Sequence, residues 1–187
     1  MTPAPHALAD LLAVTMGDAC GIGPEIIAQW WPGGREAVVV GCPKVMARAV
    51  NWMPAGQRPR VRELADLGEV STLAPDEMGV WAPPGLPEDL LDAPLGQVDV
   101  RAGRAAAACI REAVRLAQTG AVAGIVTAPL HKEALALAGE PYPGHTELLQ
   151  AEGSPPGQPP APVRMMLATA ASRSAWRPAG GCTWSPP

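Results

Sequence analysis

The sequence of 187 residues is poor in several residue types, and these shortages exclude some classes of protein. It contains no phenylalanine and one tyrosine, and small residues together with 23 prolines take up much of the chain. The four cysteines, at positions 20, 42, 109 and 182, form no C-x-x-C pair. This spacing argues against a zinc site or a redox motif, and favours isolated thiols in a reducing compartment.

Charge and hydropathy exclude two kinds of partner. The formal net charge is -4 without a long block of like charge, whereas a nucleic-acid surface needs a basic stripe. No apolar run approaches the roughly 20 residues of a membrane-spanning helix. The first ten residues lack the basic and apolar regions of a secretory signal. We therefore expect a cytoplasmic protein with no nucleic-acid and no membrane partner.

The first fifty residues alternate between apolar runs and helical patterns. Continuous apolar runs at residues 11–15 and 37–41 are typical of strands that are covered on both faces. Helices are predicted after them, over residues 25–31 and 43–53. This β-α-β-α order predicts an α/β fold, with a parallel-type sheet and flanking helices.

Prolines interrupt the next part of the chain, where only short strands at residues 61–64 and 70–73 are predicted. A helix over residues 97–119, with apolar side chains at i, i+3 and i+4 spacing, is the longest in the chain. Strands at residues 122–126 and 163–168 complete the pattern. We expect residues 1–169 to form one α/β unit.

The last segment, residues 170–187, has neither periodicity nor a strand-like run. Its mixture of Arg, Trp, Ser, Pro and Gly follows a buried-looking strand abruptly. We expect an irregular tail, and we hypothesise that it is out of frame or otherwise not native. The alternative is an ordinary disordered terminus.

Polar residues gather in the stretch from 122 to 149, on two loops joined by one short predicted helix at residues 133–138. The first loop ends in Lys132, and the second carries the motif G-H-T-E with His145 and Thr146. A strand end, loop donors and a helix N-terminus together suit an anionic small ligand. Lys132, His145 and Thr146 are the predicted substrate-binding residues.

Each of these residues also has a purely structural interpretation. Lys132 can neutralise a phosphate as a point charge, or it can be a solvated lysine at a helix start. His145 and Thr146 offer a ring nitrogen and a hydroxyl to a ligand, or one of them caps a helix.

The turn G-D-A-C-G-I-G-P-E after the first strand is rich in glycine but is not a dinucleotide fingerprint. Ile26 occupies the position of the last glycine, and no acidic residue ends the second strand. Asp18 is either a carboxylate of the site or a turn former. Because His6 lies in the loose lead-in, we assign no metal ligand, and we assign no catalytic or cofactor-binding residue either.

Taken in order, the turn, the T-A-P-L-H-K loop, the A-G-E-P-Y-P-G-H-T-E-L-L segment and the strand V-R-M-M-L-A resemble the 4-hydroxythreonine-4-phosphate dehydrogenase family of vitamin B6 biosynthesis. The resemblance covers residues 11–169. It implies a homodimer with an isocitrate/isopropylmalate dehydrogenase type of fold. The family oxidises and decarboxylates a small phosphorylated hydroxy acid with NAD or NADP and a divalent metal (zinc, magnesium or cobalt). The resemblance also implies that His145 and Thr146 contact the substrate.

The family continues beyond the M-M-L-A strand with its metal-ligand histidines, most nicotinamide contacts and much of the dimer interface. The resemblance therefore implies a fold that is incomplete at its C-terminal end, truncated or frameshifted after about Thr169, and inactive by itself. Two alternatives stay open. One is a non-catalytic fragment that binds a phosphorylated ligand, and the other is a sister dehydrogenase acting on another 4-phosphorylated sugar acid.

Overall fold

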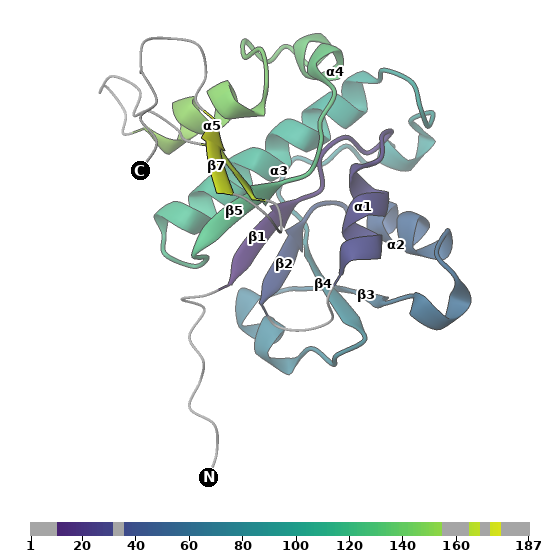
Figure 1. The fold of residues 1–187 in the computed structure, drawn as a ribbon. Helices are drawn as coiled ribbons and strands as arrows, with labels where there is room; N and C mark the ends of the chain where they lie inside the picture. Colours follow the sequence, from purple (N-terminus) through teal and green to yellow (C-terminus); the bar gives the residue numbers. More distant parts are fainter. Residues whose placement is uncertain (1–10, 32–35, 155–164, 169–172, 177–187) are drawn as a thin grey trace.

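A five-stranded parallel sheet forms the centre of the computed structural model, which describes residues 11–31, 36–154, 165–168 and 173–176 (Figure 1). The strand order is β3-β4-β2-β1-β5. The strands are β1 (Leu12–Thr15), β2 (Ala37–Val40), β3 (Arg60–Glu63), β4 (Glu77–Trp81) and β5 (Gly124–Thr127). The predicted α/β fold with a parallel sheet and flanking helices is confirmed.

The two apolar runs near the N-terminus lie at the middle of this sheet. All four residues of β2 are buried, and β1 is buried apart from the partly exposed Leu12. β1 pairs with β2 on one side and with β5 on the other, with Thr15 opposite Val40 and Thr127. A strand with a partner on each side and a helix layer on each face has no wet surface, which explains its unbroken apolar sequence.

The helices lie on both faces of the sheet. α1 (Gly23–Trp30) and α2 (Pro43–Asn51) follow β1 and β2, and the chain runs from β1 through β2 to the edge strand β3 before β4 fills the place between β2 and β3. α3 (Val100–Gln118) then leads from β4 back across the sheet to β5 on the far side of β1. Because parallel crossovers are right-handed, this reversal puts α3 on the opposite face from α1 and α2.

α3 supports the polar stretch of residues 122–149, because α4 (Lys132–Leu137) and α5 (His145–Gly153) pack against it. Its start is capped by the Asp99 carboxylate, which accepts a hydrogen bond from the Arg101 N–H at 2.8 Å. α4 and α5 pack against its other side, with Leu135 and Leu148 fully buried. Figure 1 shows these three helices together on one side of the molecule.

The proline-rich excursion differs from its prediction. β3 agrees with the predicted strand at residues 61–64, but the predicted strand at residues 70–73 is wrong. These residues belong largely to a 3-10 helix, η3 (Leu67–Thr72), whose first turn is capped by Asp66 accepting from the Gly68 N–H at 2.6 Å. Two further single 3-10 turns are η2 (Ala55–Gln57) and η4 (Leu90–Asp92).

β4, by contrast, is not predicted by the sequence. Glu77 and Gly79 break its apolar run, yet Met78 and Val80 are fully buried. Gly79 leaves room for the side chain of Leu73, because a Cβ at position 79 would lie 2.8 Å from a methyl group of Leu73, which would then have to move.

The strand predicted at residues 163–168 exists as β6 (Met165–Ala168), but it does not join the main sheet. It pairs antiparallel with β7 (Arg173–Trp176) in a separate two-stranded sheet. The prediction that the final segment lacks a strand is therefore wrong for these four residues. Its possible out-of-frame origin stays a prediction, and the rest of the segment lies outside the described residues.

Within the described part of the chain, no helix is both long enough and apolar enough to cross a bilayer.

Candidate functional site

The candidate site lies where the chain reverses its direction through the sheet, at the carboxyl ends of β1 and β5. The loop after β1 and the loop after β5 touch there, since the Asp18 N–H donates to the Pro129 carbonyl at 2.9 Å. The Ala128 N–H also donates to the Thr15 carbonyl at 3.2 Å. In open α/β sheets, ligands bind in the crevice at such a reversal point.

The glycines of the first loop serve the packing of the chain itself. Gly17 has a φ of +72°, and a Cβ there would collide with the Pro129 carbonyl oxygen. A Cβ at Gly23 would lie 2.5 Å from the Met16 carbonyl oxygen. The close approaches at Gly17 and Gly23 are therefore filled by backbone of the same chain, so the turn does not fit a dinucleotide pyrophosphate.

Asp18 is the turn former of this loop. Its side chain is 7% exposed, and its Oδ1 accepts a hydrogen bond from the Cys20 N–H at 2.9 Å. This contact is the local turn geometry that aspartate favours. It supports the structural interpretation of Asp18 over the role of a site carboxylate.

α4 begins with two polar residues that have different surroundings. His131 is the N-cap, and its Nδ1 accepts from the Ala134 N–H at 3.4 Å. Lys132 is the first residue of the helix and is exposed. His131 therefore has a structural role, whereas the ammonium group of Lys132 is accessible to a ligand.

α5 begins at His145, and its N-cap is Gly144, which offers no side-chain cap. The interpretation of His145 or Thr146 as a helix cap is therefore wrong. The first backbone hydrogen bond of the helix runs from the Leu148 N–H to the Gly144 carbonyl at 3.2 Å. The preceding N–H groups have no intrahelical acceptor and carry the positive end of the helix dipole, as at any helix N-terminus.

The structure brings Lys132 to this helix end. A Cβ at Gly144 would lie 3.5 Å from Lys132 Cε and 3.4 Å from Glu147 Oε2. The side chain of Thr146 is 4% exposed and makes no hydrogen bond to another residue of the described ranges. Lys132, His145 and Thr146 are thus neighbours, although a helix and a loop separate them in the chain.

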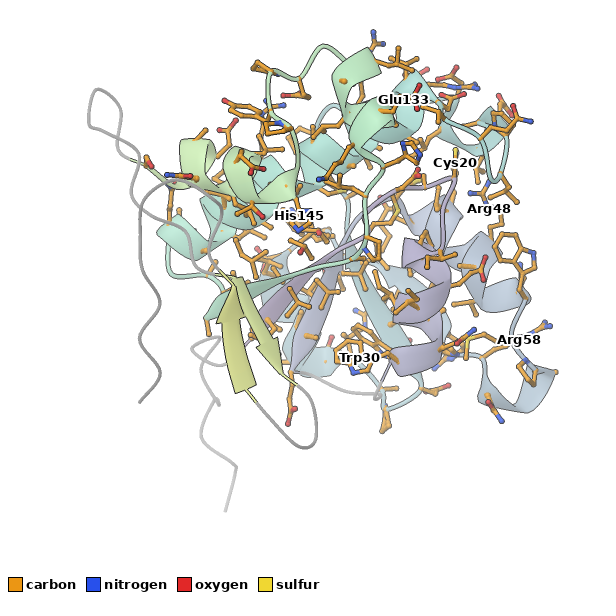
Figure 2. The ribbon with its side chains drawn as sticks, turned by 45° about the horizontal axis from the view of Figure 1, so that its top comes forward. Cys20, Trp30, Arg48, Arg58, Glu133 and His145 are labelled. Carbon is orange, nitrogen blue, oxygen red and sulfur yellow. The ribbon has the colours of Figure 1, made fainter. Side chains whose placement is uncertain are left out.

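His145 is half-buried at this helix end. Figure 2 shows it well separated from Cys20 and Arg48, which lie beside each other, with Arg48 donating to the Ala19 carbonyl at 2.7 Å. Burial lowers the pKa of His145, the nearby Lys132 lowers it further, and Glu147 opposes both. Its imidazole is consequently neutral at neutral pH, with one nitrogen as donor and the other as acceptor.

This arrangement predicts opposite effects for two charge-neutralising substitutions. We expect Lys132→Gln to raise the pKa of His145, because removing a positive neighbour favours the imidazolium. We expect Glu147→Gln to lower it further. A pH titration of the imidazole by NMR measures both, and Lys44→Gln on the exposed face of α2 is the control. Shifts of the same sign in the two variants would contradict this geometry.

Across the ranges that the structure describes, no group of three or more His, Cys, Asp or Glu side chains could hold a metal ion. His6 lies outside those ranges. The described residues therefore do not fit the divalent metal that the resemblance implies.

Glu147 influences His145, and Arg111 contacts the segment that carries it, but neither is among the predicted site residues. Glu147 lies two residues after His145, which is the only local signal for its influence on the imidazole. Arg111 approaches the segment from α3, 34 residues before His145, and no sequence spacing indicates that contact.

A parallel α/β sheet whose reversal point combines a helix N-terminus with lysine, histidine and threonine defines a class of proteins that bind small anionic ligands. Residues 34–175 match the family model described as "Pyridoxal phosphate biosynthetic protein PdxA". The chain belongs to this family, and the match reaches six residues beyond Thr169, where the sequence alone indicated a break.

Individual relatives agree with this assignment. The chain is 43% identical over 152 residues to a 4-hydroxythreonine-4-phosphate dehydrogenase of Beijerinckia indica, covering 76% of this chain and 41% of the relative. It is 43% identical over 148 residues to a D-threonate 4-phosphate dehydrogenase of Pectobacterium atrosepticum, covering 76% and 44%. The chain thus spans less than half the length of these curated relatives.

Solved structures show the same correspondence. A crystal structure of 4-hydroxythreonine-4-phosphate dehydrogenase from Klebsiella pneumoniae superimposes with a TM-score of 0.74 at 41% identity. The superposition covers 90% of this chain and 49% of that one.

Proposed function

We propose that this chain provides one wall of the substrate site of a dehydrogenase in pyridoxal phosphate biosynthesis. The substrate is 4-phosphohydroxy-L-threonine, a small phosphorylated hydroxy acid. The observation that supports this most is the convergence of Lys132, His145 and Thr146 at the N-terminus of α5. Relatives named for dehydrogenases of two 4-phosphorylated compounds support the substrate class.

Each side chain has a distinct role in this proposal. Lys132 places a positive charge beside an anionic group of the substrate, where the N–H groups of α5 also attract negative charge. Neutral His145 exchanges a hydrogen bond with a substrate hydroxyl, and the Thr146 hydroxyl takes up a further polar contact.

The proposal includes NAD or NADP as hydride acceptor and a divalent metal that would polarise the substrate hydroxyl. It also includes a homodimer in the cytoplasm. The glycine turn does not fit the nucleotide, and the described residues do not fit the metal. We therefore assign substrate binding and orientation to this chain, and no hydride-transfer step.

Two alternative functions follow from particular observations. The identity of 43% with a D-threonate 4-phosphate dehydrogenase favours a sister dehydrogenase acting on another 4-phosphorylated sugar acid. The second alternative is a non-catalytic fragment that binds the phosphorylated ligand, since the described residues fit neither the nucleotide nor the metal. All three proposals place the ligand at the same residues.

The test is calorimetric titration of the 187-residue chain with 4-phosphohydroxy-L-threonine and, separately, with D-threonate 4-phosphate. We expect His145→Ala to raise the Kd of the preferred compound by roughly threefold to tenfold, the usual effect of losing a hydrogen bond between neutral groups. His131→Asn is the control, because asparagine keeps the cap of α4 while removing the other imidazole.

Unchanged affinity in His145→Ala would remove this residue from the site. Tighter binding of D-threonate 4-phosphate than of 4-phosphohydroxy-L-threonine would favour the sister dehydrogenase.

A further inference from the structure

Arg111 on α3 joins two carboxylates that lie on either side of the G-H-T motif. Its Nη1 and Nη2 each donate to one oxygen of Glu140 at 2.7 Å, and its Nε donates to Glu152 Oε1 at 2.8 Å. Three N–H groups of one guanidinium are therefore engaged. This planar, two-point contact is available to arginine but not to lysine.

The two carboxylates enclose the segment that carries the site. Glu140 follows α4 and precedes Gly144, whereas Glu152 belongs to the last turn of α5. The side chain of Gln118 at the end of α3 also donates to the Glu152 carbonyl at 3.1 Å. Between these attachments, Leu148 is fully buried against Ile110 and Val114 of α3.

Charge explains why this attachment matters. Residues 133–154 carry four carboxylates, of Glu133, Glu140, Glu147 and Glu152, and no lysine or arginine. Arg111 is the guanidinium that approaches two of them. Without it, Glu140 and Glu152 would repel each other, and each end of the segment would lose its ion pair to α3.

We propose that Arg111 is a positioning residue for the substrate site, holding α5 against α3 so that His145 and Thr146 keep their places. This inference rests on the proposed function for the role of these two residues. The positioning itself is a property of the fold and is measured without a substrate.

α3 offers a matched control on the same face. Arg104 lies two helical turns before Arg111, is exposed, and makes no ion pair or hydrogen bond with any other residue in the described part of the chain. Both arginines line one open cleft with Glu140, so a change of charge in that cleft is common to both substitutions. Only the substitution of Arg111 breaks the link to α5.

The experiment compares Arg111→Gln, Arg111→Lys and Arg104→Gln by amide hydrogen exchange and by NMR titration of His145. In Arg111→Gln we expect the amides of residues 140–153 to exchange about threefold to tenfold faster, the range set by losing a small ion-pair network. We also expect the pKa of His145 to rise, because a loosened α5 exposes the imidazole that burial now keeps neutral. In Arg111→Lys we expect smaller changes in both amide exchange and the pKa of His145, because lysine keeps the positive charge but not the two-point contact. In Arg104→Gln we expect neither quantity to change.

Unchanged exchange and an unchanged His145 pKa in Arg111→Gln would overturn the proposal, as would equal effects in Arg104→Gln. Glu152→Gln, which removes one arm of the contact, gives a milder test if Arg111→Gln does not fold. Substrate titration then separates the two hypotheses. If His145→Ala leaves binding unchanged while Arg111→Gln shifts the pKa of His145, the positioning role stands and the proposed function fails.

Discussion

Replacing Gly103 by alanine is expected to lower the free energy of unfolding by about 2–3 kcal/mol, the usual range for overpacking a tight contact. In an open helix the same change is favourable by about 1 kcal/mol. The reason for the reversal is the crossing of α3 and α4. A Cβ at Gly103 would overlap the backbone carbonyl of Ala134 and lie 3.0 Å from the Leu135 nitrogen.

Backbone atoms cannot turn away as a flexible side chain can, so α4 must shift as a whole. Urea unfolding measures the loss, and Gly153→Ala is the control, because a Cβ at this last residue of α5 meets nothing within 4 Å. We expect the control to be neutral or slightly stabilising. A Gly103→Ala protein as stable as the parent would show that the two helices do not approach this closely.

The second large effect is expected at Glu112, a carboxylate that is 6% exposed in the middle of α3. Its Oε1 accepts from Trp81 Nε1 at 2.7 Å, and both of its oxygens accept from Arg115 at 2.7 and 2.9 Å. Glu112→Ala leaves the indole N–H without its acceptor, and we expect a loss of about 2–3 kcal/mol at neutral pH. Glu88→Ala, at an exposed residue without an ion pair in the described ranges, is the control.

The effect of Glu112→Ala depends on pH with a definite sign. The hydrogen bonds from Arg115, with a smaller contribution from Trp81, hold the pKa of Glu112 below its ordinary value against the opposing effect of burial. The stabilisation is therefore complete above the ordinary carboxyl pKa of about 4.3, and it is lost as the pH falls through the lower folded value. Urea unfolding of both proteins at several pH values checks this. A difference between parent and variant that grows towards acidic pH would contradict it.

Local patterns predicted those elements whose environment is the same along their whole length. The strands at residues 12–15 and 37–40 are covered on both faces, so their apolar runs are unbroken. α3 has one buried face, and its apolar spacing predicted it within three residues at each end. The sequence patterns did not predict β4 and η3, because a nearby glycine, glutamate and proline obscure a pattern of only a few residues.

The sequence also predicts some residues of the candidate site better than others. His145, Thr146 and Lys132 were chosen because they stand together in the chain, and the structure makes them neighbours in space as well. The sequence alone does not decide the role of Asp18, since a loop carboxylate has the same sequence context as a turn former and as a site residue. Its hydrogen bond to the Cys20 N–H distinguishes them.

By itself, the sequence determined the class of fold, the family and the motif that carries the site, because all three depend on short, ordered patterns of residue types. Only the tertiary structure decided the strand order, the helix crossing at Gly103 and the link from Arg111 to Glu140 and Glu152. The physical reason is that these contacts join residues about 30 to 40 positions apart. Their partners are selected by the direction in which α3 returns across the sheet, which no local periodicity encodes.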